Sequence, residues 1–394
     1  MKNMDPYRLF FPVGWLLGFI GVLIWVPWVL HPQSPYPGLI HPEFMIGGFL
    51  LLYSFGFLTT AIPRFTATQD MTMTEKKMAL LLFAILVLGF FTTSKILVFS
   101  ADLSLVFYLI IFAARRIQKR NSEPPPSFVF VGFGLLLALV GLVLQMLGIF
   151  EAISSALTIA SRPLFYVGFM LSLVLGIGTR LIPGILGHQP ALVPKPPGPE
   201  PRENKSFASL WVQVPPVMKV AGILFLASFL VDLILLTPLV GDILRALIGI
   251  LVAFRFWRLH RLPLNPGIMP YFLWLSAWSI LISLVLMPTF PNVRLHVAHL
   301  LYISGLGLMT MMISTRVTLS HSGQDLRIEK KSWVLLCSGI LIMAAAFFRF
   351  TGPLNADSYM TSLLVASVLW CSGLFTWMLK FGRFWLPRTT KTAH

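Results

Sequence analysis

Charged residues are scarce in this chain: Asp, Glu, Lys and Arg make up only 11% of its 394 residues. Soluble globular domains carry about 25% charged residues, because their surface must interact with water. The shortage therefore excludes an ordinary soluble domain. Hydrophobic residues make up 57% of the chain instead, and a membrane-spanning helix needs about 20 mostly apolar residues. The length leaves room for about twelve such helices with short connections.

Acidic residues and cysteines are few. The chain has 14 Asp and Glu against 30 Lys and Arg, so its formal net charge is +16. In a soluble protein this excess would indicate nucleic acid binding. Here the basic residues lie between apolar runs, where anionic lipid headgroups attract them, so we expect a lipid bilayer and no nucleic acid as partner. The two cysteines, Cys337 and Cys371, lie inside apolar runs, which argues against a disulfide framework.

The apolar runs predict an all-α integral membrane protein with about twelve transmembrane helices. We predict spans at 12–30, 44–63, 78–97, 101–114, 128–150, 164–183, 216–236, 239–257, 270–290, 297–315, 333–348 and 359–379. Lys and Arg are enriched in cytoplasmic loops, so the charge distribution tests this count. With both termini in the cytoplasm, the basic residues left on the outer side are only Lys95, Arg162, Arg245, Arg294 and Arg349.

One proline-rich segment interrupts the apolar pattern. Residues 187–215 include six prolines between positions 190 and 201. Proline at this density favours an extended, solvated segment. We interpret it as a cytoplasmic linker that divides a single polytopic domain, residues 1–394, into two halves of six helices.

Three of the predicted spans end in a similar way on the cytoplasmic side. The segments 56–66, 176–188 and 311–323 each place an arginine after small or hydroxyl residues; these are Arg64, Arg180 and Arg316. They recur every four helices, which suggests three four-helix units. The alternative is that any inner helix end favours arginine. This inner layer either binds an anionic ligand or lipid headgroup, or only anchors the helix ends.

Histidines gather near both membrane surfaces. His41 opens one span, while His296 and His299 lie three residues apart, on one face, at the start of another. Two inward-facing imidazoles from different helices are what an axially ligated haem or a copper ion requires. A lone interfacial histidine is more often simply hydrogen-bonded. His188 and His321 form a second candidate pair on the inner side.

Outer arginines favour a haem over a bare metal ion. Arg162, Arg294 and Arg349 lie at the outer ends of three spans, where guanidinium groups match the carboxylates of haem propionates. The alternative is that these side chains snorkel to the interface. Glu43 either orients the His41 ring as a hydrogen-bond acceptor or caps the helix start.

The segments 41–66, 178–188 and 296–323 resemble the NnrS family of membrane proteins. The last of these is the most specific, with a histidine at its start, a glycine-containing middle and a Thr-Arg followed by His-Ser-Gly. The resemblance extends over nearly the whole chain. It implies a haem- and copper-containing protein of the bacterial inner membrane, linked to nitric oxide metabolism and tolerance of nitrosative stress.

The resemblance also bears on the ligands. His299 and His321 match the two histidines of the family's third segment, whereas the first motif, usually His-x-His-Glu-Met, here has Glu43 in place of the second histidine. We expect haem b at His41 and His299. Copper is a weaker expectation, and its ligands would come from His296, Glu43, or the inner pair His188 and His321.

The layout is similar in topology to the catalytic subunit of haem-copper oxidases. That subunit packs twelve helices with threefold pseudosymmetry and takes haem ligands from its helices 2 and 10. A shared fold does not confer function, and the sixth and seventh predicted spans lack the copper-site histidines of that subunit. We therefore do not expect oxygen reduction.

Two other functions remain open at this stage. A cofactor-free transporter is favoured by the two six-helix halves, but ionisable groups at mid-bilayer, which coupled transport normally needs, are scarce. Asp232 and Asp242 lie near Arg245 and are expected to pair with it. A scaffold or assembly factor for another metalloenzyme is the third reading. The sequence does not determine whether the protein is an enzyme, a sensor or a nitric oxide sink, nor its redox partner or oligomeric state.

Overall fold

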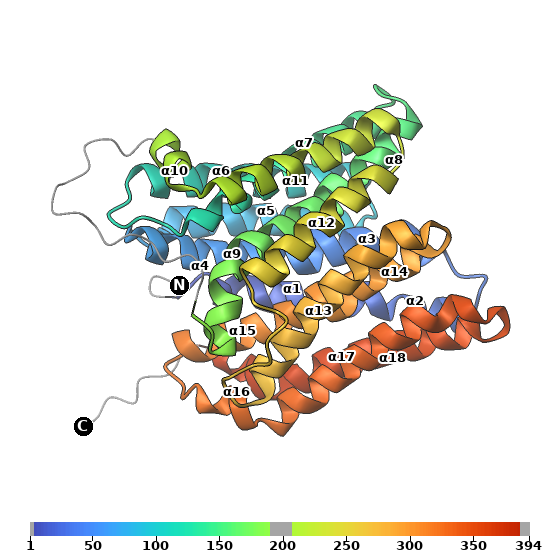
Figure 1. The fold of residues 1–394 in the computed structure, drawn as a ribbon. Helices are drawn as coiled ribbons and strands as arrows, with labels where there is room; N and C mark the ends of the chain where they lie inside the picture. Colours follow the sequence, from blue (N-terminus) through green and yellow to red (C-terminus); the bar gives the residue numbers. More distant parts are fainter. Residues whose placement is uncertain (1–3, 190–206, 387–394) are drawn as a thin grey trace.

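The computed structural model describes residues 4–189 and 207–386, which form one bundle of helices lying side by side (Figure 1). This described part contains helices and no β-strand. Ten helices in it are long and apolar enough to cross a membrane: Tyr7–Leu30, His41–Thr66, Lys95–Gln118, Pro126–Ile149, Ser155–Leu186, Pro216–Leu235, Ile268–Thr289, Pro291–His321, Trp333–Leu354 and Ala356–Trp385. The prediction of an all-α membrane protein is confirmed.

Two further predicted spans are helical but do not meet the same criteria of length and composition. Helix α5 (Met73–Phe91) has 19 residues and carries Glu75, Lys76 and Lys77 near its start. Helix α12 (Leu239–Arg255) has only 17 residues. The count of twelve spans therefore stays a prediction, although both helices pack within the bundle.

The boundary between the third and fourth predicted spans was placed wrongly. Helix α5 ends at Phe91, and α6 (Lys95–Gln118) has 24 residues instead of the short run predicted at 101–114. Thr93 has a left-handed backbone with φ of 52°, and the Ser94 hydroxyl accepts a hydrogen bond from the Leu97 amide to begin α6. Hydropathy alone misses this break because apolar residues lie on both sides of it. As a result, Asp102 lies two turns inside α6 and not at its end.

Three of the spans contain a π-helical segment between two α-helical parts. In chain order these parts are α3 (His41–Glu43), η2 (Phe44–Leu50) and α4 (Leu51–Thr66); α8 (Ser155–Pro163), η4 (Leu164–Phe169) and α9 (Met170–Leu186); and α14 (Arg294–Leu300), η6 (Leu301–Gly307) and α15 (Leu308–His321). π-Helical turns are rare and frequently mark functional sites. They occur here in the three spans that end with the repeated arginines.

The packing of the helices repeats every four spans. The first helix of each set packs against the π-containing second one: α1 (Tyr7–Leu23) on η2 and α4, α7 (Val129–Ile149) on η4 and α9, and α13 (Ile268–Thr289) on η6 and α15. The third and fourth pack together as α5 with α6, α11 (Pro216–Leu235) with α12, and α17 (Trp333–Thr351) with α18 (Tyr359–Phe381). Helix α6 then packs on α7, α12 on α13 and α18 on α1, so the sets close into a ring. This pattern supports three four-helix units.

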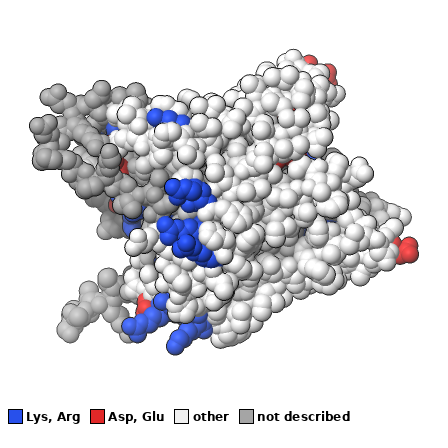
Figure 2. Space-filling view, viewed as in Figure 1, with Lys and Arg blue, Asp and Glu red and all other residues white. Residues whose placement is uncertain are grey.

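The two ends of the bundle differ in charge. The described chain begins and ends on the same side of the bundle, where Arg8 Nη1 donates to the Leu386 carbonyl at 2.9 Å, and Lys and Arg side chains gather at this end in the face that Figure 2 shows. The rest of that face is almost uncharged. Over the described part of the chain, large apolar residues such as Leu81, Phe91, Ile234 and Phe347 are exposed. This is the surface that lipid tails require. The six prolines between positions 190 and 201 of the predicted linker lie outside the described residues, and its later part contains the short helix α10 (Phe207–Gln213).

Candidate functional site

His41 and His299 lie next to each other, with nearly parallel rings, at the end of the bundle where α3 and α14 lie (Figure 1). The centroids of their rings are 6.5 Å apart and the ring planes differ by 7°. His41 begins α3, just before η2, and His299 is in the last turn of α14, just before η6. The two π-containing spans thus hold the two rings at one level.

The hydrogen bonds of the two rings follow one pattern. His41 Nδ1 lies 2.7 Å from the carbonyl oxygen of Gly21, and His299 Nδ1 lies 2.7 Å from that of Leu295. Because a carbonyl only accepts, each Nδ1 must carry the proton and donate it. Each Nε2 then bears a lone pair and has no hydrogen-bond partner among the described residues. Fixing the tautomer in this way is typical of metal-binding histidines.

The centroid distance between the rings is compatible with one metal ion held by both histidines. Imidazole nitrogens bind metals at about 2.0–2.1 Å, so two imidazoles on one ion have ring centroids roughly 6 Å apart. The observed centroid distance of 6.5 Å is close to this value. His41 and His299 are therefore the residues that would hold a haem iron.

Arg349 is a buried cation beside this pair. Its side chain is 9% exposed, and it lies close enough to act electrostatically on both rings. Its Nη1 donates to His296 Nδ1 at 2.5 Å, and Tyr359 is also a hydrogen-bond partner. None of the described carboxylates pairs with it. A buried cation without a counter-charge is costly, so an anionic group of a ligand would be stabilised here.

The other predicted outer residues are placed differently. Arg294 donates to the Asp242 carboxylate at 2.5 and 3.1 Å, so its guanidinium already has a partner. Arg162 is exposed and acts on Glu43 electrostatically. Glu43 accepts a hydrogen bond from the Tyr166 hydroxyl at 3.3 Å. One of the two roles predicted for Glu43 was to accept a hydrogen bond from His41, but the Gly21 carbonyl accepts that bond instead.

The inner histidines do not form a pair. Arg64 Nη1 donates to His321 Nε2 at 2.9 Å, and Asp5 lies 3.7 Å from the other ring nitrogen. His188 instead lies near Arg261 and Arg258. Burial is the main cause that lowers the pKa of His188, and these two positive charges lower it further. Across residues 4–189 and 207–386, no group of three or more His, Cys, Asp or Glu side chains is arranged to hold a metal ion. The inner pair predicted for copper, His188 and His321, therefore has separate sets of neighbours.

Two of the repeated arginines are tied to neighbouring elements. Arg64 joins α4 to His321 at the end of α15, and Arg316 pairs with the buried Glu329 of α16 (Arg327–Lys331). Arg180 lies at the corresponding place in α9. These contacts favour the anchoring reading for Arg64 and Arg316.

Asp5 allows a test of this anchor. Burial alone would raise the pKa of Asp5, but His321, Arg64 and Arg8 outweigh it and hold the pKa below its ordinary value. A lowered folded-state pKa stabilises the fold above the ordinary pKa, and this stabilisation is lost as the pH falls. We expect Asp5→Asn to lower the unfolding free energy by about 1 kcal/mol or less at pH 7. The difference in unfolding temperature between Asp5→Asn and the unsubstituted protein should shrink as the pH is lowered below the ordinary pKa of an aspartate. A difference that grows as the pH falls would contradict the contact between Asp5 and these cations.

Asp102 is a residue that the sequence analysis missed. It is fully buried in α6, and neither of its carboxyl oxygens has a hydrogen-bond partner in the described part of the chain. Gly47 of η2 lies so close that a methyl group there would overlap the carboxyl. Glu43 is near enough for the two acids to interact electrostatically. The signal in the sequence was a lone Asp within an apolar run, which marks a functional candidate in a membrane protein.

Replacing Asp102 by leucine should stabilise the protein. A buried carboxyl without a hydrogen-bond partner is costly to fold, whereas leucine has a similar shape and no polar atom. We expect the unfolding free energy to rise by about 1–3 kcal/mol, measured by thermal or denaturant unfolding in detergent. Asp242→Leu is the matched control: this buried carboxylate accepts from Arg245 and Arg294, so its loss should destabilise. A destabilised Asp102→Leu protein would contradict this explanation.

The prediction that Asp232, Asp242 and Arg245 pair is confirmed. Arg245 Nη2 donates to Asp232 at 2.7 Å and to Asp242 at 2.8 Å. All three side chains are at most 3% exposed, and Arg294 adds a second cation to Asp242. The network is balanced in charge and joins α11, α12 and α14.

A family model described as NnrS protein matches residues 4–388 of the chain. A search of curated proteins finds no match. The matched range includes both histidines of the outer pair, all three π-helical segments and the inner arginines.

Proposed function

The chain belongs to the NnrS family of membrane proteins, which is related to nitric oxide, and we propose that it binds haem b at the His41–His299 pair and nitric oxide at that haem. The observation that supports this most is the geometry of the pair: parallel rings 6.5 Å apart, each with Nδ1 donating to a backbone carbonyl. When bound, a haem iron would supply a site for nitric oxide in exchange for one of the two imidazoles. We further propose that the role is nitric oxide metabolism or tolerance of nitrosative stress.

The chain's own residues have defined tasks in this proposal. The Gly21 and Leu295 carbonyls keep each Nε2 deprotonated and oriented. Arg349 would form an ion pair with the propionate carboxylates, because none of the described carboxylates pairs with it. His296 accepts from Arg349 and positions it. Copper has no part in the proposal, because the residues that would bind it are not brought together.

The proposed membrane and orientation follow from charge. We place the protein in the bacterial inner membrane with both termini in the cytoplasm. Support comes from the gathering of Lys and Arg at the bundle end that carries both termini (Figure 2), as the enrichment of basic residues on the cytoplasmic side requires. The haem would then lie toward the opposite, outer face.

The test is an absorption spectrum of detergent-purified protein from haem-replete cells, oxidised and dithionite-reduced, with and without nitric oxide. We expect a Soret band of a bis-histidine haem that shifts when nitric oxide is added to the reduced protein. Metal analysis on the same sample should give iron. A colourless, iron-free protein from such cells would overturn the proposal.

A second candidate function is coupled transport. Scarcity of intramembrane acids argued against it, but Asp102 is a fully buried acid within a span, the kind of residue that proton- or ion-coupled transport uses. Substrate flux into proteoliposomes by haem-free protein, abolished by Asp102→Asn, would favour transport.

A further inference from the structure

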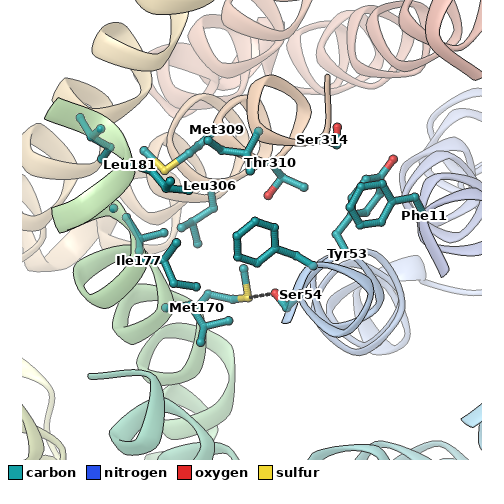
Figure 3. A pocket seen from close by; sticks show the side chains of 16 residues that line it. Phe11, Tyr53, Ser54, Met170, Ile177, Leu181, Leu306, Met309, Thr310 and Ser314 are labelled. Atoms are coloured by element: carbon teal, nitrogen blue, oxygen red, sulfur yellow. Dashed lines mark hydrogen bonds between the residues drawn. The ribbon is translucent and has the colours of Figure 1, made fainter. Parts of the chain in front are cut away.

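A small cavity lies between α1, α4, α9 and α15, where the three π-containing spans meet (Figure 3). Its volume is about 100 Å³. Sites for drug-sized ligands measure about 300–1,000 Å³, so this cavity is too small for haem, a lipid tail or most organic substrates. It has room for a molecule of a few atoms.

The wall of the cavity is mainly apolar. Side chains such as Met170, Ile177, Leu306 and Met309 point into it (Figure 3), and none of the described residues that line it is charged. Two of the polar lining groups already have protein partners: Ser54 Oγ donates to Met170 Sδ at 3.4 Å, and Ser314 Oγ donates to a carbonyl of its own helix at 3.0 Å. Apolar cavities of about 150 Å³ stay dry and take up benzene or xenon. The chemistry of this cavity therefore suits a small, neutral, apolar guest.

The cavity is placed directly inward of the histidine pair. Leu306 belongs to η6, and Met170 follows η4 immediately. Leu306 is seven residues after His299, which is about 10 Å along the helix axis. The π-helical segments thus separate the cavity, deeper in the bundle, from the pair at its outer end.

We infer that this cavity is a holding site for a neutral diatomic gas of the nitric oxide class, on its way to the His41–His299 pair. The delivery role rests on the proposed function, whereas the ability of the cavity to hold a gas does not depend on haem. A neutral diatomic dissolves in the apolar membrane interior and needs no charged group for binding. Of the hydroxyl groups in the wall, that of Tyr53 has no hydrogen-bond partner in the described part of the chain and is available to such a molecule.

Xenon is the probe, because it is apolar, small and does not bind haem iron. Crystals or detergent samples under xenon pressure should show xenon in the cavity by anomalous scattering or xenon NMR. Ser54→Leu and Thr310→Phe, which narrow the cavity from two different helices, should abolish it. Ser104→Leu, the same change at an exposed position of α6, should leave it intact. After flash photolysis, nitric oxide rebinding should slow several-fold in the two filled variants, with their Soret bands unchanged.

The outcomes separate the two proposals. Absence of xenon from the cavity of the unsubstituted protein would overturn the gas site. Xenon binding with unaltered nitric oxide kinetics in both filled variants would overturn delivery. If the protein contains no haem, the proposed function fails, and the xenon measurement still decides whether the cavity holds an apolar gas.

Discussion

Replacing His299 by alanine should remove the haem and leave the bundle folded. If Nε2 of His299 is an axial ligand, its loss leaves the iron with one protein ligand, His41. Removing even a hydrogen-bond partner of a ligand weakens metal binding by about 10–100-fold, so we expect haem occupancy to fall at least tenfold. The measurement is the ratio of Soret to protein absorbance after purification from haem-replete cells. His41→Ala should behave in the same way.

His31→Ala is the matched control for this result. His31 is exposed and has no task in the proposed haem site, so its loss should leave the Soret band in place. Size-exclusion profiles and unfolding temperatures must stay similar across the three single variants. An unaltered spectrum in the double variant His41→Ala, His299→Ala would exclude the pair as ligands.

Replacing Arg245 by leucine should destabilise the protein more than any other single change considered. Arg245 is 1% exposed and is the described cation that holds both Asp232 and Asp242. Without it, Asp232 is left as a buried carboxylate with no counter-charge. Breaking a buried pair in this way costs about 3–5 kcal/mol, which denaturant unfolding in detergent would detect.

A compensating change distinguishes loss of charge balance from loss of packing. The double variant Arg245→Leu, Asp232→Asn restores neutrality and leaves the Asp242–Arg294 pair intact, so it should recover most of the lost stability. Arg327→Leu is the exposed control, since that side chain is 88% exposed and faces Asp325 at 3.8 Å; a change within about 0.5 kcal/mol is expected there. Equal loss in the single and double Arg245 variants would contradict the electrostatic explanation.

The positions of the helices could be predicted from sequence, but not their ends. Apolar runs identify the part of each helix that faces lipid, and the predicted 297–315 lies within Pro291–His321 for this reason. The ends extend further because polar and charged residues continue the helix into the interface. At Thr93 and Ser94 the chain turns within an apolar stretch, which hydropathy does not detect.

The candidate site could likewise be predicted only in part from the sequence. His41 and His299 were expected at one level because each begins a span on the outer side. The tautomer of His41 is set by the Gly21 carbonyl of another helix, a contact that the sequence does not reveal. That of His299 is set by the Leu295 carbonyl of its own helix, which depends on the rotamer of the side chain. Asp102 was overlooked because the predicted span began at residue 101, which placed the carboxyl at the membrane surface, where it costs little.

The π-helical segments affect how such a chain can change over generations. Each π turn holds one residue more than an α-helix would use. Loss of a single codon within 301–307 would remove that extra residue, restore α-helical hydrogen bonding and leave the orientation of α15 relative to His299 nearly unchanged. Loss of one codon from the regular α-helix at 308–314 would instead rotate Arg316 and the rest of the helix by roughly 100° relative to His299. A one-residue deletion should therefore be tolerated better within the three π-helical segments than in the α-helical parts of the same spans.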